Sequence, residues 1–340
     1  MKPSSHQETL GLWLGLLGVV IFAMTLPMTR LAVGDSSDPQ LPPLFVTAGR
    51  AAIAGVLSLV VLLALRAEAP RASQAVALAL CAAGTVFGFP LFLSLALRHV
   101  DAMHAAVVTG VLPLGTALAA ALYFRQRPSR GFWVCAVLGC ALVLGFAVHK
   151  GRGALSAADG LLLLAVASAS VGYVAGARLA AQMSAQRVIC WVLVLSLPLT
   201  VPATLLSWPA QPARASAWWG LGYVALFSMW LGFFAWYRAL ALGGTVRVSQ
   251  VQLVQPFLAL LFAVPVLGEA LELDTVVFSL AVIATVFLGK KMPVDAAPGP
   301  VADEAAREVA KAVSKAQALG SSNRDANRDT KRDAMGDRTA

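Results

Sequence analysis

The chain carries few charged residues. Lys, Arg, Asp and Glu make up 13% of its 340 residues and apolar residues make up 59%, whereas a soluble domain has roughly 25% charged and 45–50% apolar residues. This shortage excludes an ordinary soluble protein. The net charge of +9 does not indicate a nucleic-acid partner, because residues 292–340 hold eight basic and eight acidic residues and the basic excess lies mostly at the ends of apolar runs.

The chain also lacks the motifs of catalysis. It has no G-x-x-x-x-G-K-[ST] phosphate-binding loop, which argues against an ATP-driven pump. It has no H-E-x-x-H or G-x-S-x-G motif, no intramembrane pair of Asp and no mid-span Lys, which argues against an intramembrane enzyme. The four cysteines show neither C-x-x-C nor zinc-ligand spacing and are interpreted as packing residues. We therefore expect no enzyme activity, no metal and no cofactor.

Apolar residues form ten long runs separated by short connections. A membrane-spanning helix needs roughly 20 predominantly apolar residues, and each run is close to that length. The runs lie near residues 10–32, 43–65, 74–97, 101–124, 131–149, 157–181, 187–207, 216–241, 246–267 and 273–289. The sequence therefore predicts an all-α polytopic membrane protein with ten transmembrane helices and little room for a soluble catalytic domain.

Two parts of the chain are similar to each other. Residues 91–145 can be laid over residues 234–288 without a gap at an offset of 143 residues, which pairs Pro113 with Pro256. The turn inside the first part is basic and the turn inside the second is acidic. The basic residues are Arg125, Arg127 and Arg130, and the acids are Glu269, Glu272 and Asp274. Under the positive-inside rule the two turns face opposite sides of a bilayer, so the pattern predicts two inverted five-helix repeats, residues 10–149 and 157–290.

The loops between the runs predict the orientation. With the amino terminus inside, nine basic residues fall in cytoplasmic loops and four in outer loops, as the positive-inside rule requires. We expect residues 1–9 to form the cytoplasmic N-terminus of a multi-pass protein in a bacterial cytoplasmic (inner) membrane. Residues 291–340 change abruptly to Pro, Ala and charge and are predicted to be a disordered polar cytoplasmic tail, with a binding role left open.

Two runs carry a central proline together with polar side chains, and these residues are candidates for a site. A proline frees a backbone carbonyl one turn earlier, and protein, water or a ligand must satisfy that carbonyl. Thr109, Pro113 and Thr116 share one helical face, as do Ser249, Gln252 and Pro256, and Gln255 is added because a glutamine in a span is costly in lipid. We expect these residues to line a polar cavity. The alternative is that the prolines shape the helices and the glutamines bond neighbouring helices.

A charged residue inside a span is rarer and more informative. Arg50 lies several residues inside the second run, so it cannot readily reach water and is expected to face the bundle interior. It could hold a carboxylate of a substrate or brace backbone carbonyls. Tyr173 and Trp236 could floor a substrate pocket, with simple packing as the alternative. Arg30 and Arg178 lie nearer the ends of runs and are interpreted as anchors.

The chain offers few groups for energy coupling. None of its acids lies at the centre of a span, although a proton-driven pump commonly uses a buried carboxylate as its relay. His104 lies near the end of a run and is of a residue type that titrates close to neutral pH. We expect it to be solvated or to cap a helix rather than to carry a proton. The sequence leaves the coupling ion open.

Three motifs carry a resemblance to a known family. Residues 237–245 read YRALALGGT, residues 253–257 read LVQPF and residues 267–269 read LGE. Together with Arg50 they resemble the drug/metabolite transporter (DMT) superfamily, in particular its EamA-type transporters, over about residues 10–290. The first repeat departs from the pattern, because the overlay places Arg125 and Gln126 on Gly268 and Glu269. The resemblance implies an exporter fold and leaves the substrate open among amino acids, nucleobases, sugars and toxic compounds.

The residues and the resemblance together predict a secondary transporter. It is expected to export small polar metabolites (amino acids or related compounds, or drugs) by alternating access. Its expected partners are a small-molecule substrate and the lipid bilayer, and a homodimer is left open. The alternatives are a non-transporting membrane helper subunit or an intramembrane enzyme, because helices with polar stripes can also bind partner helices.

Overall fold

The computed structural model of the protein describes residues 5–123, 127–150, 155–180, 182–243, 251, 254–291 and 294–295. Within these ranges the regular structure is helical, apart from two antiparallel strands of two residues each, β1 (Arg127–Pro128) and β2 (Val294–Asp295). The helices are α1 (Ser5–Ala23), α2 (Thr25–Val33), α3 (Pro43–Ala64), η1 (Ala72–Gln74), α4 (Ala75–Cys81), η2 (Ala82–Gly88), α5 (Phe89–Ala96), α6 (Ala102–Thr109), α7 (Leu112–Tyr123), α8 (Arg130–Lys150), α9 (Ala157–Ala180), α10 (Ala185–Leu206), α11 (Ala215–Tyr223), η3 (Val224–Leu231), α12 (Gly232–Gly243), α14 (Gln255–Leu267) and α15 (Leu273–Lys291). The predicted tail beyond residue 295 lies outside the described residues.

Eight helical stretches are long and apolar enough to cross a bilayer. Some consist of several elements in line, such as Thr9–Val33, which joins α1 to α2, and Ala72–Ala96, which contains η1, α4, η2 and α5. Two further apolar helices, Gln255–Leu267 and Leu273–Gly289, are shorter. The prediction of an all-helical, polytopic membrane protein is confirmed at this level.

Several of the spans are irregular near their middle. η2 and η3 are π-helical segments inside the spans Ala72–Ala96 and Ala215–Trp236. Helices α6 and α7 are separated at Gly110 and Val111, where Pro113 cannot donate a hydrogen bond to the carbonyl of Thr109 four residues earlier. Within a bilayer, irregular backbone is tolerated only where it is buried in protein or lines a cavity. These segments therefore indicate where a cavity is expected.

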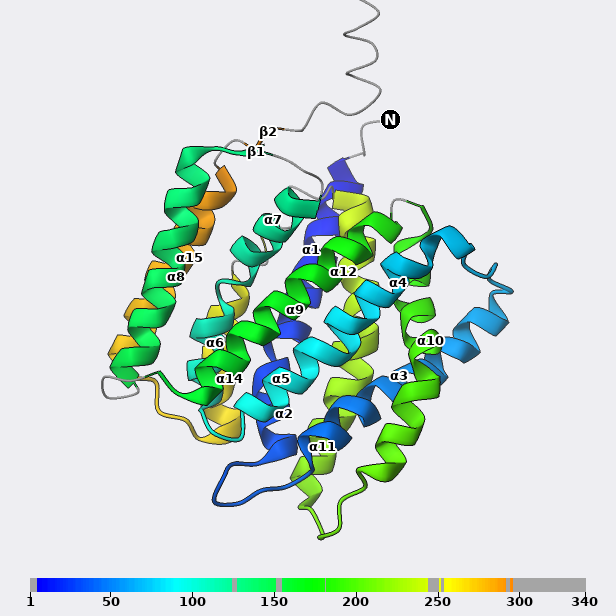
Figure 1. Cartoon of the computed structure of the whole chain (residues 1–340), viewed down its shortest axis with the longest axis horizontal. Helices are drawn as coiled ribbons and strands as arrows, with labels where there is room; N and C mark the ends of the chain where they lie inside the picture. The colour runs from blue at the N-terminus through cyan, green and yellow to red at the C-terminus, as the bar shows by residue number, and fades with distance from the viewer. Residues whose placement is uncertain are drawn as a thin grey trace, which may run out of the picture.

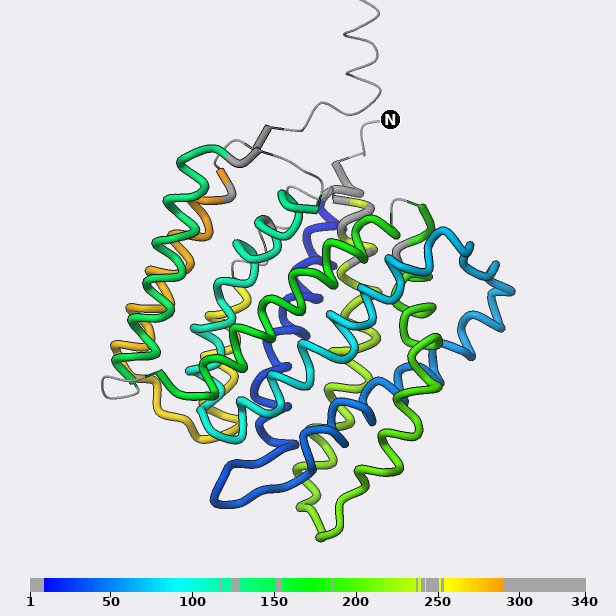
Figure 2. The backbone as a smooth tube through the Cα atoms, viewed as in Figure 1, coloured from blue at the N-terminus to red at the C-terminus, as the bar shows by residue number. Residues whose placement is uncertain are grey.

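The helices pack side by side into one bundle (Figure 1). α10 lies along α3, α12 along α1, α15 along α8, and both α5 and α7 lie against α9. The two halves of the chain interleave rather than forming separate lobes, because α15 lies beside α8 at one edge and α10 beside α3 at the other (Figure 2). The start of α1 and the β1–β2 pair lie at one end of the bundle, and the turn between α14 and α15 lies at the opposite end (Figure 1).

Small residues allow the closest helix crossings. A Cβ atom added to Gly84 of η2 would lie 2.3 Å from the carbonyl oxygen of Ser168, and one added to Gly172 of α9 would lie 2.7 Å from Cγ2 of Thr85. Such a distance leaves no room for even a methyl group. Close backbone approach at small residues is how helices associate in lipid, where there is no hydrophobic force between them. The backbones of η2 and α9 are thus in close contact where the two elements cross.

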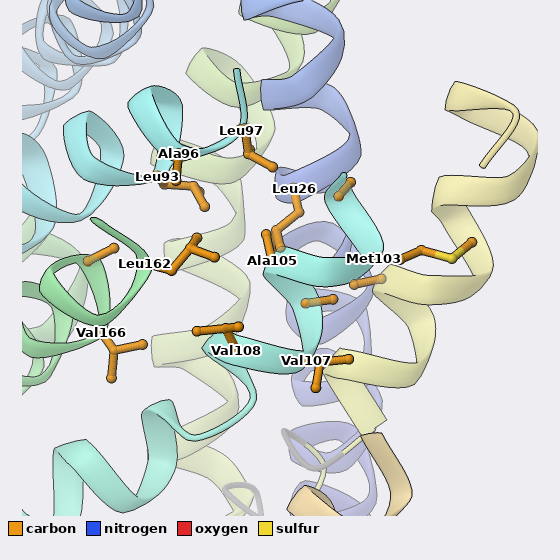
Figure 3. Close-up of a cluster of buried hydrophobic side chains, with 14 of the residues drawn as sticks. Leu26, Leu93, Ala96, Leu97, Met103, Ala105, Val107, Val108, Leu162 and Val166 are labelled. Carbon is orange, nitrogen blue, oxygen red and sulfur yellow. The ribbon is translucent and has the colours of Figure 1, made fainter. Parts of the chain in front are cut away.

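Helix α6 lies in the centre of the largest apolar cluster. Its residues Ala102, Ala105 and Val108 are at most 1% exposed. Figure 3 shows the neighbours that surround it, including Leu26 of α2, Leu93 of α5 and Leu162 of α9. A helix that is apolar on all sides is a core helix, so α6 is shielded from lipid by the elements around it.

Candidate functional site

The irregular segments meet at a cavity in the middle of the bundle. It encloses about 80 Å³ and is lined by residues from α1, α2, α3, η2, α5, α6, α7, α9, η3, α12, α14 and α15. Most of its wall is apolar. The polar residues of the wall are Thr25, Arg50, Thr85, Thr109, Tyr173, Ser228 and Gln255. Both halves of the chain contribute, so the cavity lies between them.

Arg50, on helix α3, is the charged residue of this wall, and it is 3% exposed. Its Nη2 donates a hydrogen bond to Oγ of Ser228 over 2.9 Å. Ser228 in turn shares a hydrogen bond of 2.8 Å with Oγ1 of Thr25. This chain of contacts joins α3, η3 and α2, and it fixes one edge of the guanidinium plane.

The other donors of Arg50 have no protein partner within the described part of the chain. Nε and Nη1 are buried and make no hydrogen bond there. No ion pair to Arg50 forms among the same residues. The effective penalty for burying an ion is several kcal/mol unless an opposite charge and hydrogen bonds compensate it. The cavity therefore favours an anionic group beside Nε and Nη1, because such a group would supply both the opposite charge and the hydrogen-bond acceptors.

The cavity brings together six of the ten predicted site residues. These are Arg50, Thr109, Pro113, Tyr173, Gln255 and Pro256. Thr116 lies one turn further along α7 and does not line the cavity. Trp236 lies on α12, where its backbone packs against Gly18 of α1. Ser249 and Gln252 lie outside the described residues.

The predicted anchors have partners at the ends of the bundle. Arg30 donates to the carbonyl oxygens of Leu97 and Val100 at the end of α5. The guanidinium of Arg178 donates to the hydroxyl of Tyr123 and lies 5.6 Å from the centre of its ring. Neither arginine lines the cavity, which agrees with their interpretation as anchors.

Three hydroxyl residues of the wall were not predicted from the sequence, namely Thr25, Thr85 and Ser228. Single hydroxyls in apolar runs carry little signal, because they commonly bond to a carbonyl of their own helix, as Thr85 does to Cys81 over 2.6 Å. The repeat could have identified two of them. Extending the offset of 143 residues six positions earlier pairs Thr85 with Ser228, and both lie in π-helical segments at the cavity.

The size of the cavity limits what it can hold in this conformation. Pockets for small ligands typically enclose about 300–1,000 Å³, several times the volume found here. A metabolite larger than a few atoms therefore requires the surrounding helices to move apart. The breaks at Gly110 and Val111 and in the two π-helical segments are places where the spans can bend.

Cysteine labelling tests whether this space is reachable. Thr109→Cys in a Cys140→Ala background should react with small, water-soluble thiol reagents, because Thr109 lines the cavity whereas Cys81, Cys135 and Cys190 are buried. Thr200→Cys is the matched control, since Thr200 is 0% exposed and lies away from the cavity. We expect a rate at least ~10-fold higher for position 109 than for position 200, because only thiols that meet solvent react readily. Equal protection of both positions would mean that the cavity is closed to water in all conformations.

Sequence comparison relates the chain to a family of transporters. The family model described as the EamA-like transporter family matches residues 9–147 and 156–289. The "Uncharacterized transporter YdeK" of Bacillus subtilis is 43% identical over 283 residues, which cover 82% of this chain and 96% of that protein. The "Probable terminal-alkyne amino-acid exporter" of Streptantibioticus cattleyicolor is 26% identical over 268 residues, covering 76% of this chain and 85% of that protein.

A solved structure has a similar fold. It is described only as the crystal structure of a protein, and it superposes with a TM-score of 0.55 at 17% sequence identity. The match covers 83% of this chain and 96% of the other. At this identity the likeness concerns the fold alone.

Proposed function

The chain belongs to the EamA-like transporter family, and on that premise we propose that it is a secondary exporter of small carboxylated metabolites, namely amino acids or related compounds, that works by alternating access. Members of this family are membrane transporters for small molecules rather than enzymes. The substrate class, the direction of transport and the mechanism are proposals.

The observation that carries the proposal is the partly unpaired guanidinium of Arg50 in the central cavity. Arginine presents its N–H groups in a planar fork that matches a carboxylate. Ser228 accepts one of the two N–H groups of Nη2. The other N–H of Nη2, together with the unpartnered Nη1 or Nε beside it, leaves one edge of the fork for the two oxygens of a substrate carboxylate. Such a two-pronged, charge-assisted pair is among the strongest hydrogen-bonded contacts in proteins. A neutral sugar or nucleobase would leave the buried charge uncompensated.

The rest of the wall suits the other parts of an amino acid. Apolar and aromatic residues such as Phe22, Met229 and Phe233 surround the polar edge and can pack against a side chain. Gln255 and Tyr173 offer further hydrogen-bonding groups for an amine or a polar substituent. The Streptantibioticus cattleyicolor relative, whose name describes an amino-acid exporter, supports the same substrate class and the outward direction.

Secondary structure supports the inverted repeat. The offset of 143 residues that relates the two sequences also relates the starts of three helix pairs, α5 with α12, α7 with α14 and α8 with α15. The same offset pairs the π-helical segment η2 with residues 225–231, which lie within η3. Because α9 follows an odd number of predicted spans, its unit is expected to enter the membrane in the opposite sense to α1. We propose residues 10–149 and 157–290 as the two units.

This arrangement supports alternating access. The cavity lies between the two units and is flanked by broken or π-helical spans from each of them. A rocking motion of one unit against the other would open the cavity first to one side and then to the other. The start of α1 and the strand β2 lie at the same end of the bundle (Figure 1), which supports two cytoplasmic termini in a bacterial inner membrane.

Reconstitution tests the proposed function directly. Purified protein in liposomes is expected to exchange labelled amino acids against unlabelled ones, and to leave the matched amino-acid amides untransported because they lack the carboxylate. Empty liposomes provide the background. A non-transporting helper subunit would give no exchange for any compound in the panel, and equal exchange of acids and amides would contradict the role of Arg50.

A further inference from the structure

A second, larger hollow lies at the end of the bundle that holds the turn between α14 and α15. It encloses about 930 Å³, and we call it the vestibule. Its wall is formed by the start of α6 and α9, the end of α8 and the turn after α14. Under the proposed topology the vestibule opens to the outside. Helix α6 lies between it and the central cavity, because Met103 and His104 line the vestibule whereas Ala106 and Thr109 line the cavity.

One contact of α6 is made by His104. Its Nε2 lies 2.6 Å from Oδ1 of Asp159 on α9. The two side chains are 12% and 4% exposed, so the expectation of a solvated or capping histidine is wrong. The sequence could not reveal this pair, because its members are 55 residues apart and only helix packing brings them together.

Asp159 is held in place by the start of its own helix. Ser156 donates two hydrogen bonds to Oδ2 of Asp159, from its backbone N–H over 2.8 Å and from its hydroxyl over 2.7 Å. The backbone N–H of Asp159 points back to Oγ of Ser156 over 3.3 Å. This is a reciprocal capping arrangement at a helix N-terminus. It fixes the carboxylate so that Oδ1 faces His104.

A second contact comes from Glu269. Its two carboxylate oxygens accept the backbone N–H groups of Ala102 and Met103 over 2.7 and 2.8 Å. These are free donors at the start of α6, where a negative charge is favourable. The preceding residue, Gly268, has a left-handed φ of 72° that ends α14, and this turn directs Glu269 towards α6. The Gly-Glu motif thus joins the α14–α15 turn to the start of α6.

Helix α6 is a short element that is separate from α7. It has eight residues, so it is about 12 Å long at 1.5 Å per residue. At its far end Gly110 and Val111 separate it from α7, and no continuous helix transmits a constraint there. The polar contacts at its near end therefore add to the apolar packing that holds its cavity-lining end in place.

Building on the proposed function, we propose that α6 is the outer gate of the cavity, that His104, Asp159 and Glu269 form its latch, and that a proton on His104 strengthens the latch. These are positioning residues, since none of them lines the central cavity. A protonated imidazole and the carboxylate form an ion pair, whereas a neutral imidazole gives a hydrogen bond in which only the acceptor is charged, and that contact is weaker. External acid should therefore hold the gate closed.

Several charged groups on neighbouring elements bear on this titration. Asp159 on α9 and Glu269 after α14 bind α6 directly, as described. Lys150 on α8 is engaged by Glu272 and Asp274 of the α14–α15 turn and α15, and Arg30 on α2 lies 3.8 Å from Asp101. His99, which precedes α6, shares a hydrogen bond with Ser36. His149 of α8 pairs with the partly exposed Asp274, so His104 is the imidazole, among the described residues, that contacts a buried acid on another helix.

Protonation of Glu269 is expected to weaken the latch at low pH. Burial raises the pKa of its carboxyl above the ordinary value, and the backbone N–H groups of Met103 and Ala102 oppose this effect. It therefore gains a proton at a higher pH than an exposed glutamate. A protonated carboxyl loses one of its two acceptor positions for the N–H groups of α6. Strong acid is therefore expected to weaken the contact between Glu269 and α6, even where it strengthens the contact between His104 and Asp159.

The test measures how fast the cavity opens to the outside. Thr109→Cys in the Cys140→Ala background is the parent, and an impermeant thiol reagent is added to right-side-out membrane vesicles at a series of outer pH values. His104→Gln, Asp159→Asn and Glu269→Gln are each added to the parent. Lys150→Gln is the matched control, because this residue lies in the vestibule wall but bonds α8 to Glu272 and α15 rather than to α6. The ratio of each rate to that of the parent at the same pH cancels the titration of the thiol.

We expect the His104→Gln and Asp159→Asn ratios to be about tenfold at acidic outer pH and to become smaller as the outer pH rises, because the proposed ion pair is then replaced by a hydrogen bond. The Glu269→Gln ratio should exceed one at neutral pH, and the Lys150→Gln ratio should stay near one. A His104→Gln ratio that does not change with pH, in protein that elutes as a folded monodisperse species, would overturn the proposal. Asp159→Asn decides the matter if His104→Gln does not fold. This assay needs no substrate, so a failure of liposome exchange would leave its result intact.

Discussion

Arg50→Met is expected to abolish amino-acid exchange in liposomes without destabilising the protein. Removing one partner of a buried, hydrogen-bonded charge pair costs about 2–5 kcal/mol, which corresponds to a fall in exchange of about 30-fold to several thousand-fold at low substrate concentration. In the substrate-free protein the same change removes an uncompensated buried cation. Replacing buried charge with an apolar side chain of similar volume is often neutral or stabilising, so the melting temperature should stay the same or rise.

Amino-acid exchange and melting temperature together distinguish an arginine that binds the substrate from one that stabilises the fold. Arg50→Lys keeps the charge but loses the planar fork, so we expect an intermediate loss of about tenfold. Ser228→Ala removes the one hydrogen bond that holds Arg50 among the described residues, and it should weaken exchange less than Arg50→Met does. If Arg50→Met melts well below the parent, the arginine braces the fold; if it exchanges amino acids normally, the carboxylate site lies elsewhere.

Gly84→Ala is expected to lower the stability of the folded protein sharply. The new Cβ atom would lie 2.3 Å from the carbonyl oxygen of Ser168, so η2 and α9 would have to move apart along their crossing. Overpacking typically costs about 1–3 kcal/mol and occasionally more, and backbone atoms cannot yield as a flexible side chain can. Thermal unfolding of the detergent-solubilised protein, followed by fluorescence after size-exclusion chromatography, measures the effect.

Gly222→Ala provides the matched control. An added Cβ at Gly222 of α11 would meet nothing within 4 Å. Alanine is favoured over glycine in a helix by about 0.8–1.0 kcal/mol, so this variant should be at least as stable as the parent. The same substitution is thus predicted to act in opposite directions at two helical positions. Equal melting temperatures for the two variants would mean that the η2–α9 crossing is looser than described.

The sequence contained more of the fold than of the site. Span lengths and the paired prolines Pro113 and Pro256 indicated the helices and the repeat, because lipid imposes length and polarity on every span. Arg50 was predictable as an interior residue, since a charge has nowhere else to lie. Thr25 and Ser228 were not, because a hydroxyl in an apolar run is compatible with many positions. Their role follows only from packing that sets them beside Arg50.

The contacts at the vestibule could not be predicted from the sequence for a related reason. His104 and Asp159 lie on helices of different halves, and Glu269 reaches a helix that precedes it by 166 residues. Nothing in local composition encodes such distances. The Gly-Glu motif marked a turn, and its function as a cap for α6 became apparent only when the position of α6 was known.

The central claim is that one five-helix unit occurs twice and crosses the membrane in opposite senses around the cavity. Single cysteines at Ser129, in the turn before α8, and at Ala270, in the turn after α14, test it most directly in a Cys140→Ala background. An impermeant thiol label added to intact cells should modify the cysteine at position 270 at once and the one at position 129 only after the cells are permeabilised. Labelling of both positions from the same side would contradict the account.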